Sequence, residues 1–245
     1  MTRSCSFVAL LLSVIFVGTF ADNYTPFVCN ANQCNTYNAN LAFKEAKPSD
    51  FIGYADVRTE INDLLLRPIK SPQDYAGRLL GSGRGILIYG PPGTGKTFML
   101  STFSAELKAL GWKAWLVRPS DVLTTAWNGE AVQRFNCIFE CARSTKNVLL
   151  VFDEGEMLLG DRGLSSTDAQ LVNVGLNQMN NIENFRVVLL TNYAESIDSA
   201  IRRRVGNIYC MRLPSAVERS QIFRYLLSSD QVNGVAWKVV VIAIV

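Results

Sequence analysis

The sequence at positions 90–97 is Gly90-Pro91-Pro92-Gly93-Thr94-Gly95-Lys96-Thr97, a complete G-x-x-x-x-G-K-[ST] pattern. Before it, residues 85–89 form a short apolar run, as expected of a buried parallel strand. After it, residues 98–110 have a helical period and end at Gly111. A strand, a glycine-rich loop and a helix in this order predict that residues 90–97 bind the phosphates of a nucleotide. A glycine-rich turn that happens to contain Lys-Thr is the alternative.

The residue types in this loop fit phosphate chemistry. Glycines let successive backbone N–H groups turn inward where a side chain would collide, and the N-terminus of the next helix adds partial positive charge. Lys96 is expected to reach the β- and γ-phosphates, and the Thr97 hydroxyl is expected to ligate Mg²⁺.

Another apolar segment ends in two carboxylates. Residues 148–152 are followed directly by Asp153 and Glu154. Parallel sheets bind ligands at the carboxyl ends of their strands, which gives a buried strand a reason to end in acids. We expect Asp153 to hold the Mg²⁺ shell and Glu154 to orient and polarise the attacking water. The alternative is a pair of acids that caps the next helix.

The composition excludes several kinds of chemistry. The chain has 245 residues, of which 49% are hydrophobic and 18% charged, and this suits a globular core. It contains no histidine, which excludes a Ser-His-Asp triad and most zinc sites. The net charge is only +3 and no basic stripe is evident, so nothing in the sequence points to nucleic acid.

The six cysteines form no C-x-x-C pair, which argues against a zinc ribbon or a thioredoxin-type site. Cys137 and Cys141 lie four residues apart in a predicted helix, and we expect packed thiols there rather than a bridge. Cys29 and Cys34 could pair in an oxidising compartment.

Residues 1–21 are typical of a secretory signal peptide. Arg3 precedes an apolar run, and Thr19-Phe20-Ala21 places small residues where a signal peptidase cleaves. We therefore expect the chain to enter the secretory pathway and to be lumenal or secreted. A membrane anchor formed by residues 7–20 is one alternative, although the run is short for a membrane span, and a segment of neither kind is the other.

The remaining pattern predicts one α/β domain. Residues 22–47 are rich in Asn and small polar residues and have no clear period, so we expect a linker. From Pro48 onward, strand candidates alternate with helical patterns, which predicts a mostly parallel sheet covered by helices on both faces. The expected strands are 85–89, 112–117, 148–152, 186–190 and 207–213, and the expected helices are 56–66 (ending before Pro68), 98–110, 130–143, 168–180 and 216–227.

Five segments resemble those of the AAA ATPases in order and spacing, and are most similar to the spastin/katanin-like group: 50–53, 90–97, 152–154, 190–192 and 198–204. The resemblance covers about residues 48–228. It implies a P-loop NTPase core of the AAA+ type over residues 48–214, with ATP as the nucleotide and Mg²⁺ as the metal. It also implies that Ile52 and Gly53 line the adenine pocket.

The resemblance implies further roles at matching positions. Asn192 would contact the γ-phosphate or the lytic water, and Arg203 and Arg204 would reach into a neighbouring subunit's site, where a guanidinium can spread phosphoryl charge. Trp127 would grip an extended polypeptide in a pore, although Asn128 departs from the family's usual aliphatic residue. The alternatives are a turn-forming Asn, a solvated basic run and a packing Trp.

The end of the sequence departs from the family, in which a lid of several helices follows the core. Residues 215–245 hold one helical segment and a β-branched tail. We expect a remnant of the lid and a homo-oligomer weakened by lost interface area. The leading interpretation is ATP hydrolysis that drives remodelling or unfolding of a protein substrate in a ring. The alternatives are a nucleotide-binding regulatory subunit with little turnover and, more weakly, a nucleic-acid-directed ATPase.

Fusing residues 1–24 to a cytosolic reporter tests the N-terminal segment. We expect the fusion to enter the secretory pathway, because a charged start, an apolar centre and a small-residue site are the features of a signal peptide. Protease protection and the reporter's mass in microsomes measure entry, and a matched fusion that carries Leu11→Arg should stay outside. A parent reporter that remains cytosolic and full length would contradict the prediction.

Overall fold

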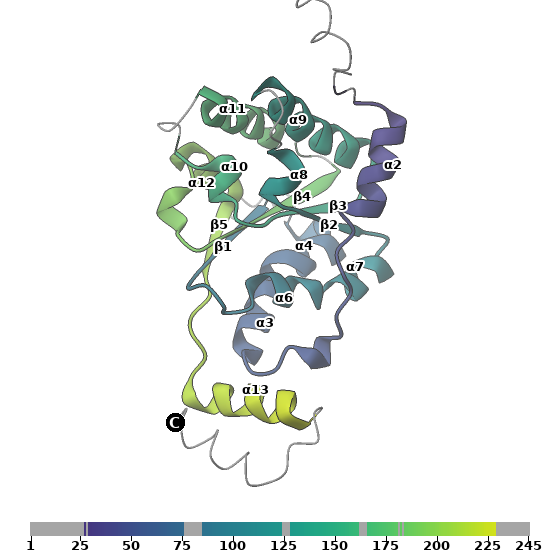
Figure 1. Cartoon of the computed structure of the whole chain (residues 1–245). Helices are drawn as coiled ribbons and strands as arrows, with labels where there is room; N and C mark the ends of the chain where they lie inside the picture. The colour runs from purple at the N-terminus through teal and green to yellow at the C-terminus, as the bar shows by residue number, and fades with distance from the viewer. Residues whose placement is uncertain are drawn as a thin grey trace, which may run out of the picture.

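Five parallel strands form the centre of the computed structural model (Figure 1). The structure describes residues 27, 29–75, 85–123, 128–161, 166–180, 182 and 184–228. The spatial order of the strands is β2-β3-β4-β1-β5, and every neighbouring pair is parallel, which confirms the predicted α/β class. Their bounds are β1 (Gly85–Tyr89), β2 (Lys113–Val117), β3 (Val148–Phe152), β4 (Phe185–Thr191) and β5 (Gly206–Cys210).

The central strands are apolar on both sides because helices cover both faces of the sheet. In β3, Leu150 and Phe152 point into one core, whereas Leu149 and Val151 point into the other. All five residues of β3 are buried, which accounts for its uninterrupted apolar sequence.

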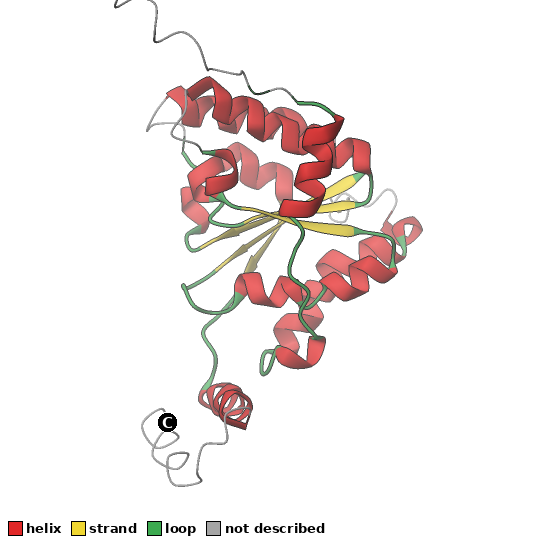
Figure 2. Ribbon diagram, turned by 45° about the vertical axis from the view of Figure 1, so that its right-hand side comes forward, coloured by secondary structure: helices red, strands yellow, loops and turns green. Residues whose placement is uncertain are grey.

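Figure 2 shows the sheet between two layers of helices. One layer holds α2 (Ala31–Asn40), α8 (Pro119–Val122), α9 (Asn128–Thr145), α10 (Glu156–Leu159), α11 (Ser166–Asn180) and α12 (Ser199–Val205). The other holds α3 (Ala55–Ile61), η2 (Asn62–Leu66), α4 (Arg67–Lys70), α6 (Lys96–Ser101) and α7 (Ser104–Ala109). The short elements are η1 (Pro48–Asp50), α5 (Pro72–Tyr75) and η3 (Ala194–Ser196). Within the described residues, no helix is both long enough and apolar enough to cross a bilayer.

Two predicted helices differ from the structure. Helical structure was expected to end before Pro68, but it runs on to Lys70 through the π-helical turn η2 and into α4. Pro68 lies in the first turn of α4, where a backbone N–H has no partner within that helix. The helix expected over 98–110 is interrupted between α6 and α7. There the Thr102 hydroxyl donates to the Met99 carbonyl at 2.6 Å, and such bonds compete with the helical ladder.

Within the described residues 29–47, the structure has a helix and an edge-pairing segment where a linker was expected. Asn30 caps α2 by accepting a hydrogen bond from the Gln33 N–H. The strap, residues 41–46, then runs along the free edge of β2. Its Phe43 N–H donates to Ala114 and its Leu41 carbonyl accepts from Leu116, at 2.9 and 2.7 Å. The strap covers an edge strand that would otherwise present unpaired backbone groups.

The predicted state of the cysteines was also wrong. Cys29 is bonded to Cys137 and Cys34 to Cys141, so both disulfides join α2 and its N-terminal flank to α9. Neither pair is local, because their sequence separations are 108 and 107. Closing one loop of that length restricts the unfolded chain by about 4–5 kcal/mol.

At the C-terminal end of the described chain, α13 (Ala216–Ser228) follows β5 through an extended segment and lies below the helices of the second layer in Figure 1. Residues 229–245, including the predicted tail, lie outside the described residues.

Truncating Phe139 should destabilise the domain strongly. Its ring is fully buried and contacts Phe135, Phe152 and Phe185, with centroids 5.2, 5.5 and 5.9 Å away. We expect Phe139→Ala to cost about 3–5 kcal/mol, through lost transfer energy and the cavity left behind. Chemical denaturation measures this, with Met157→Ala, at a 52% exposed side chain, as a control that should change little. A loss below about 1 kcal/mol would show that the core is not packed as described.

Candidate functional site

The order of the strands brings three predicted site segments together. Because β4 lies between β1 and β3, the segments that follow these strands meet at one edge of the sheet. Lys96 Nζ donates to Asn192 Oδ1 at 2.9 Å, which joins the loop after β1 to the residue after β4. Thr97 Oγ1 donates to Asp153 Oδ2 at 3.0 Å, which joins the same loop to the end of β3.

The backbone of the loop over residues 90–97 requires glycine. At Gly90 a Cβ atom would lie only 2.1 Å from the Met211 carbonyl oxygen, so no side chain fits between the loop and β5's extension. Gly95, with φ of 86°, is the left-handed residue that starts α6. The loop therefore keeps its backbone free to approach a ligand closely.

The ammonium group of Lys96 lies over this loop. It donates to the carbonyl oxygens of Gly90 and Pro91, at 2.8 and 3.0 Å, as well as to Asn192. Burial lowers the pKa of Lys96, and the charges of Asp153 and Glu156 oppose that change. An ammonium group on a flexible four-carbon stem, held by carbonyls in this way, is placed to turn toward a phosphate.

The oxygen atoms of Thr97 and Asp153 fit a Mg²⁺ ion. An octahedral Mg²⁺ with oxygen ligands about 2.1 Å away has adjacent ligands roughly 2.9 Å apart. The two side-chain oxygens are 3.0 Å apart and both are hard ligands. These two residues would hold the ion, which, when bound, would neutralise charge on the phosphates.

Glu154 has an exposed carboxylate beside this pair. Its φ is 50°, which is uncommon for a residue other than glycine. Such strained positions concentrate at functional sites. Glu154 is exposed at the end of β3, so its carboxylate is open to a water molecule.

A cavity of about 270 Å³ lies next to the phosphate loop. It places the predicted Ile52 near the loop and near Ile222 and Tyr225 of α13. Gly53 backs onto α13, where a Cβ atom would lie 3.2 Å from Glu218 Cβ. The cavity is lined by Asp50, Phe51, Ile52, Tyr54, Gly93, Thr94, Gly95, Phe98, Ile222 and Tyr225.

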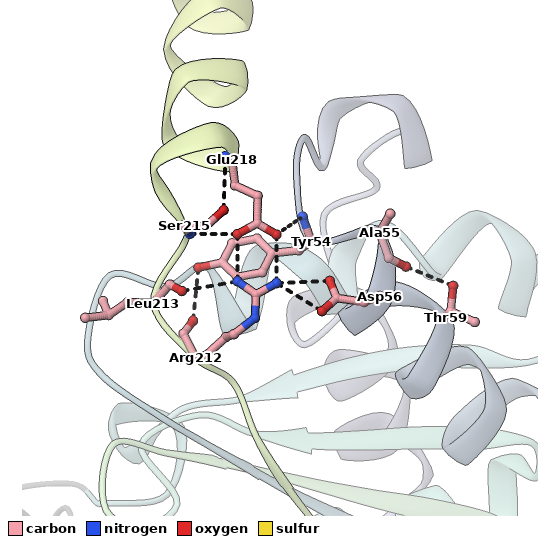
Figure 3. A network of polar contacts seen from close by, with 8 residues as sticks. All are labelled: Tyr54, Ala55, Asp56, Thr59, Arg212, Leu213, Ser215 and Glu218. Atoms are coloured by element: carbon pink, nitrogen blue, oxygen red, sulfur yellow. Dashed lines mark hydrogen bonds and ion pairs between the residues drawn. The ribbon is translucent and has the colours of Figure 1, made fainter. Parts of the chain in front are cut away.

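A group of residues joined by hydrogen bonds and ion pairs holds α13 in place. We call it the Arg212 network: Tyr54, Asp56, Arg212, Ser215 and Glu218. Figure 3 shows the Arg212 guanidinium between two carboxylates. It donates to Glu218 Oε2 at 2.6 Å and to Asp56 Oδ2 at 3.0 Å, which ties α13 to α3. Glu218 also accepts from the Tyr54 N–H at 3.3 Å. The network therefore holds the helix that carries one wall of the cavity.

The network keeps its carboxylates ionised. Hydrogen bonds from Arg212 are the main reason that the pKa values of Glu218 and Asp56 lie below their ordinary range. Because folding lowers both pKa values, the network stabilises the folded protein fully above about pH 4, where these carboxyl groups titrate in the unfolded chain. This stabilisation is lost as the pH falls through the pKa values of the folded protein.

Sequence reasoning missed the Arg212 network. Arg212 and Asp56 are 156 residues apart, and no local pattern links them. One signal was present, because Ser215 and Glu218 form the S-x-x-E pattern of a capping box. That pattern predicts the start of α13 but not what else Glu218 contacts.

Arg203 and Arg204 lie away from this site, at the end of α12. The strand that follows them starts at Gly206, which pairs with Gly85 at the amino end of β1. The phosphate loop begins beyond the carboxyl end of β1, about 13 Å along the strand. Arg203 is exposed, and Arg204 donates to Asn180 Oδ1 at 2.8 Å.

Trp127, the predicted pore residue, lies outside the described residues, between α8 and α9.

Comparisons with known proteins agree with this geometry. A model of the ATPase family associated with various cellular activities matches residues 86–213. The human vacuolar protein sorting-associated protein 4A is 31% identical over 195 residues, which cover 76% of this chain and 43% of that protein. The outer mitochondrial transmembrane helix translocase of Danio rerio is 28% identical over 195 residues, or 76% of this chain and 50% of that protein. The chain thus spans half or less of the length of these relatives.

Replacing Arg212 should weaken nucleotide binding without touching the phosphate loop. We expect Arg212→Gln to raise the Kd for ATP roughly three- to tenfold, because α13 loses its ionic tie and the cavity wall loosens. Calorimetry measures the Kd, and Arg67→Gln, which breaks an exposed ion pair with Asp63, is the matched control. Equal affinities for Arg212→Gln and the parent would show that α13 does not shape the pocket.

Proposed function

This chain belongs to the AAA family of ATPases, as its motifs predicted, and from that premise we propose that it hydrolyses Mg²⁺-bound ATP to remodel a protein substrate within a ring of subunits. Two hydrogen bonds carry the proposal. Lys96 donates to Asn192 at 2.9 Å, and Thr97 donates to Asp153 at 3.0 Å. These residues come from three separate segments, and an ATPase needs this set of groups around one phosphate chain.

We assign the binding of ATP to two neighbouring regions. The loop over residues 90–97 offers backbone N–H groups and Lys96 to the phosphates. The cavity lined by Ile52, Tyr54 and Ile222 is apolar enough for a base. Thr97 and Asp153 would hold Mg²⁺.

Hydrolysis requires a group that activates water, and Glu154 is the candidate. Its carboxylate is exposed at the edge of the sheet where the phosphate site lies. It would orient the water and accept its proton as the water attacks the γ-phosphorus atom. Asn192, within hydrogen-bond distance of Lys96, would position the γ-phosphate or the same water.

The place of Arg203 and Arg204 supports action between subunits. They lie at the amino edge of the sheet, so their own phosphate loop is out of reach. An exposed guanidinium at that edge could instead meet the phosphate loop of a second copy. A ring would be one way to repeat this contact.

The proposed substrate is a protein. One relative is named a transmembrane helix translocase and others are named for vacuolar protein sorting. Trp127 remains our prediction for the residue that would grip the substrate.

The variant Glu154→Gln separates binding from hydrolysis. We expect it to bind ATP as the parent does but to hydrolyse it at least about 100-fold more slowly, because the amide cannot accept the proton. Steady-state phosphate release and calorimetry measure the two properties, and Glu140→Gln, on the exposed side of α9, should change neither. If the parent itself binds ATP without turnover, the protein is a nucleotide-binding subunit rather than a working ATPase.

Mixing two inactive variants tests whether the arginines act between subunits. Lys96→Ala should lose ATP binding, and the double variant Arg203→Ala with Arg204→Ala should bind ATP but hydrolyse it slowly. We expect activity to return in the mixture, because the first variant supplies intact arginines to the second variant's site. A mixture of Lys96→Ala with Glu154→Gln should stay inactive. If the first mixture is also inactive, the arginines do not act across an interface.

A further inference from the structure

Four cysteines link two parts of the chain that lie more than 100 residues apart. The Cα atoms are 5.5 Å apart in the Cys29–Cys137 pair and 5.1 Å apart in the Cys34–Cys141 pair. Both separations fall within the range that a disulfide requires. The two cysteines of α9 are fully buried, and Figure 1 shows α2 alongside α9.

We propose that these cysteines are an oxidation site, and that its two disulfides staple α2 to the ATPase core, so that this protein matures in an oxidising compartment. The proposal concerns the core's covalent structure and does not depend on the proposed substrate or ring.

The chemistry is thiol–disulfide exchange with an oxidised dithiol oxidoreductase. One cysteine thiolate first forms a mixed disulfide with the oxidoreductase. The thiolate of its partner cysteine then attacks that bond, and the oxidoreductase leaves as a dithiol. Each new S–S bond removes two electrons and two protons from the cysteine pair, and the oxidoreductase takes them up.

Besides the disulfides, the burial of Tyr37 and of Leu41, its C-cap residue, holds α2 to the core. Of its ten residues, all of them described, Tyr37 alone is buried. The rest are mostly Asn, Thr, Gln and Ala, which bury little apolar surface. One contact beside the staple is the Arg134 guanidinium over the Phe27 ring, at 4.8 Å. Covalent bonds therefore supply what this polar helix cannot gain from packing.

The strap continues directly from the stapled helix. Leu41 and Phe43 pair with the free edge of β2, and Glu45 forms an ion pair with Lys108 at 2.8 Å. Opening both disulfides would release α2, and the strap would lose its fixed start. The β2 edge would then be exposed to pairing with other chains.

Two independent observations point to the same compartment. Disulfides that hold structure persist in oxidising environments and are rare in reducing ones. The sequence of residues 1–21, which plays no part in the disulfides, is typical of a secretory signal. The chain's fifth described cysteine, Cys210, is exposed and unpaired and serves as an internal control.

Peptide mapping tests the pairing. The full chain is expressed through a secretory pathway, alkylated in denaturant without reductant, and digested with trypsin. Cys29 and Cys34 share one tryptic peptide that ends at Lys44, and Cys137 and Cys141 share residues 135–143. We expect these two peptides to remain joined until reduction, with Cys210 alkylated. Further cleavage after Glu140 should leave both halves of residues 135–143 attached to the peptide that ends at Lys44. In Cys34→Ser, Cys141 should be alkylated as well as Cys210, whereas Cys137 should stay joined to Cys29.

Thermal unfolding tests the stapling. Reductant should lower the Tm by on the order of 10 °C in the parent and in Cys210→Ser. It should have no effect on the variant with serine at all four positions, whose Tm should already be low. If that variant does not fold, the Tm values of the parent and of Cys210→Ser, with and without reductant, still test the stapling.

Three results would overturn the proposal. The first is four alkylated cysteines in the unreduced protein, and the second is local Cys29–Cys34 and Cys137–Cys141 pairs. The third is one zinc ion per chain bound to free thiols, because the sulfur atoms of Cys29, Cys137 and Cys141 lie within 4.8 Å of one another. Metal analysis of the unreduced protein measures the last.

Discussion

The insertion of β4 between β1 and β3 is the constraint on which the site depends. Three adjacent parallel strands end at the same edge, so the residues that follow them share one small volume. Asn192 is thereby within 2.9 Å of Lys96, and the loop that carries Lys96 also reaches Asp153 through Thr97. The apolar faces of helices on both sides of the sheet exclude water from the strands.

A second group of contacts shapes the rest of the nucleotide pocket. The cavity beside the phosphate loop is closed by residues 50–54 from one side and by α13 from the other. These two parts meet through Arg212, which is partly exposed and holds two carboxylates at once. The phosphate half of the site is therefore fixed by the buried sheet, whereas the base half depends on polar contacts near the surface, which are weaker.

The segment that leads to this pocket is fastened at both ends. The disulfides fix α2 at its start, and the hydrogen bond from Tyr225 to Asp50, at 2.8 Å, lies near its end. Between them the strap follows the β2 edge by backbone hydrogen bonds. Most residues of the segment are polar, so covalent bonds and directed hydrogen bonds add to the burial of Tyr37 and Leu41 in holding it.

Local signals in the sequence were enough to predict several elements. The 90–97 loop, the acids after β3 and the alternation of strands and helices were all predicted, because glycine patterns and apolar runs act on neighbouring residues. The direct contact of Lys96 with Asn192 was not predicted, because it depends on the order of the strands in the sheet. The cysteine pairs, the packing of α2 and the ion pair of Arg212 with Asp56 became visible only in the folded chain. Each of these joins residues more than 70 positions apart, and such contacts depend on how the whole chain closes rather than on any local preference.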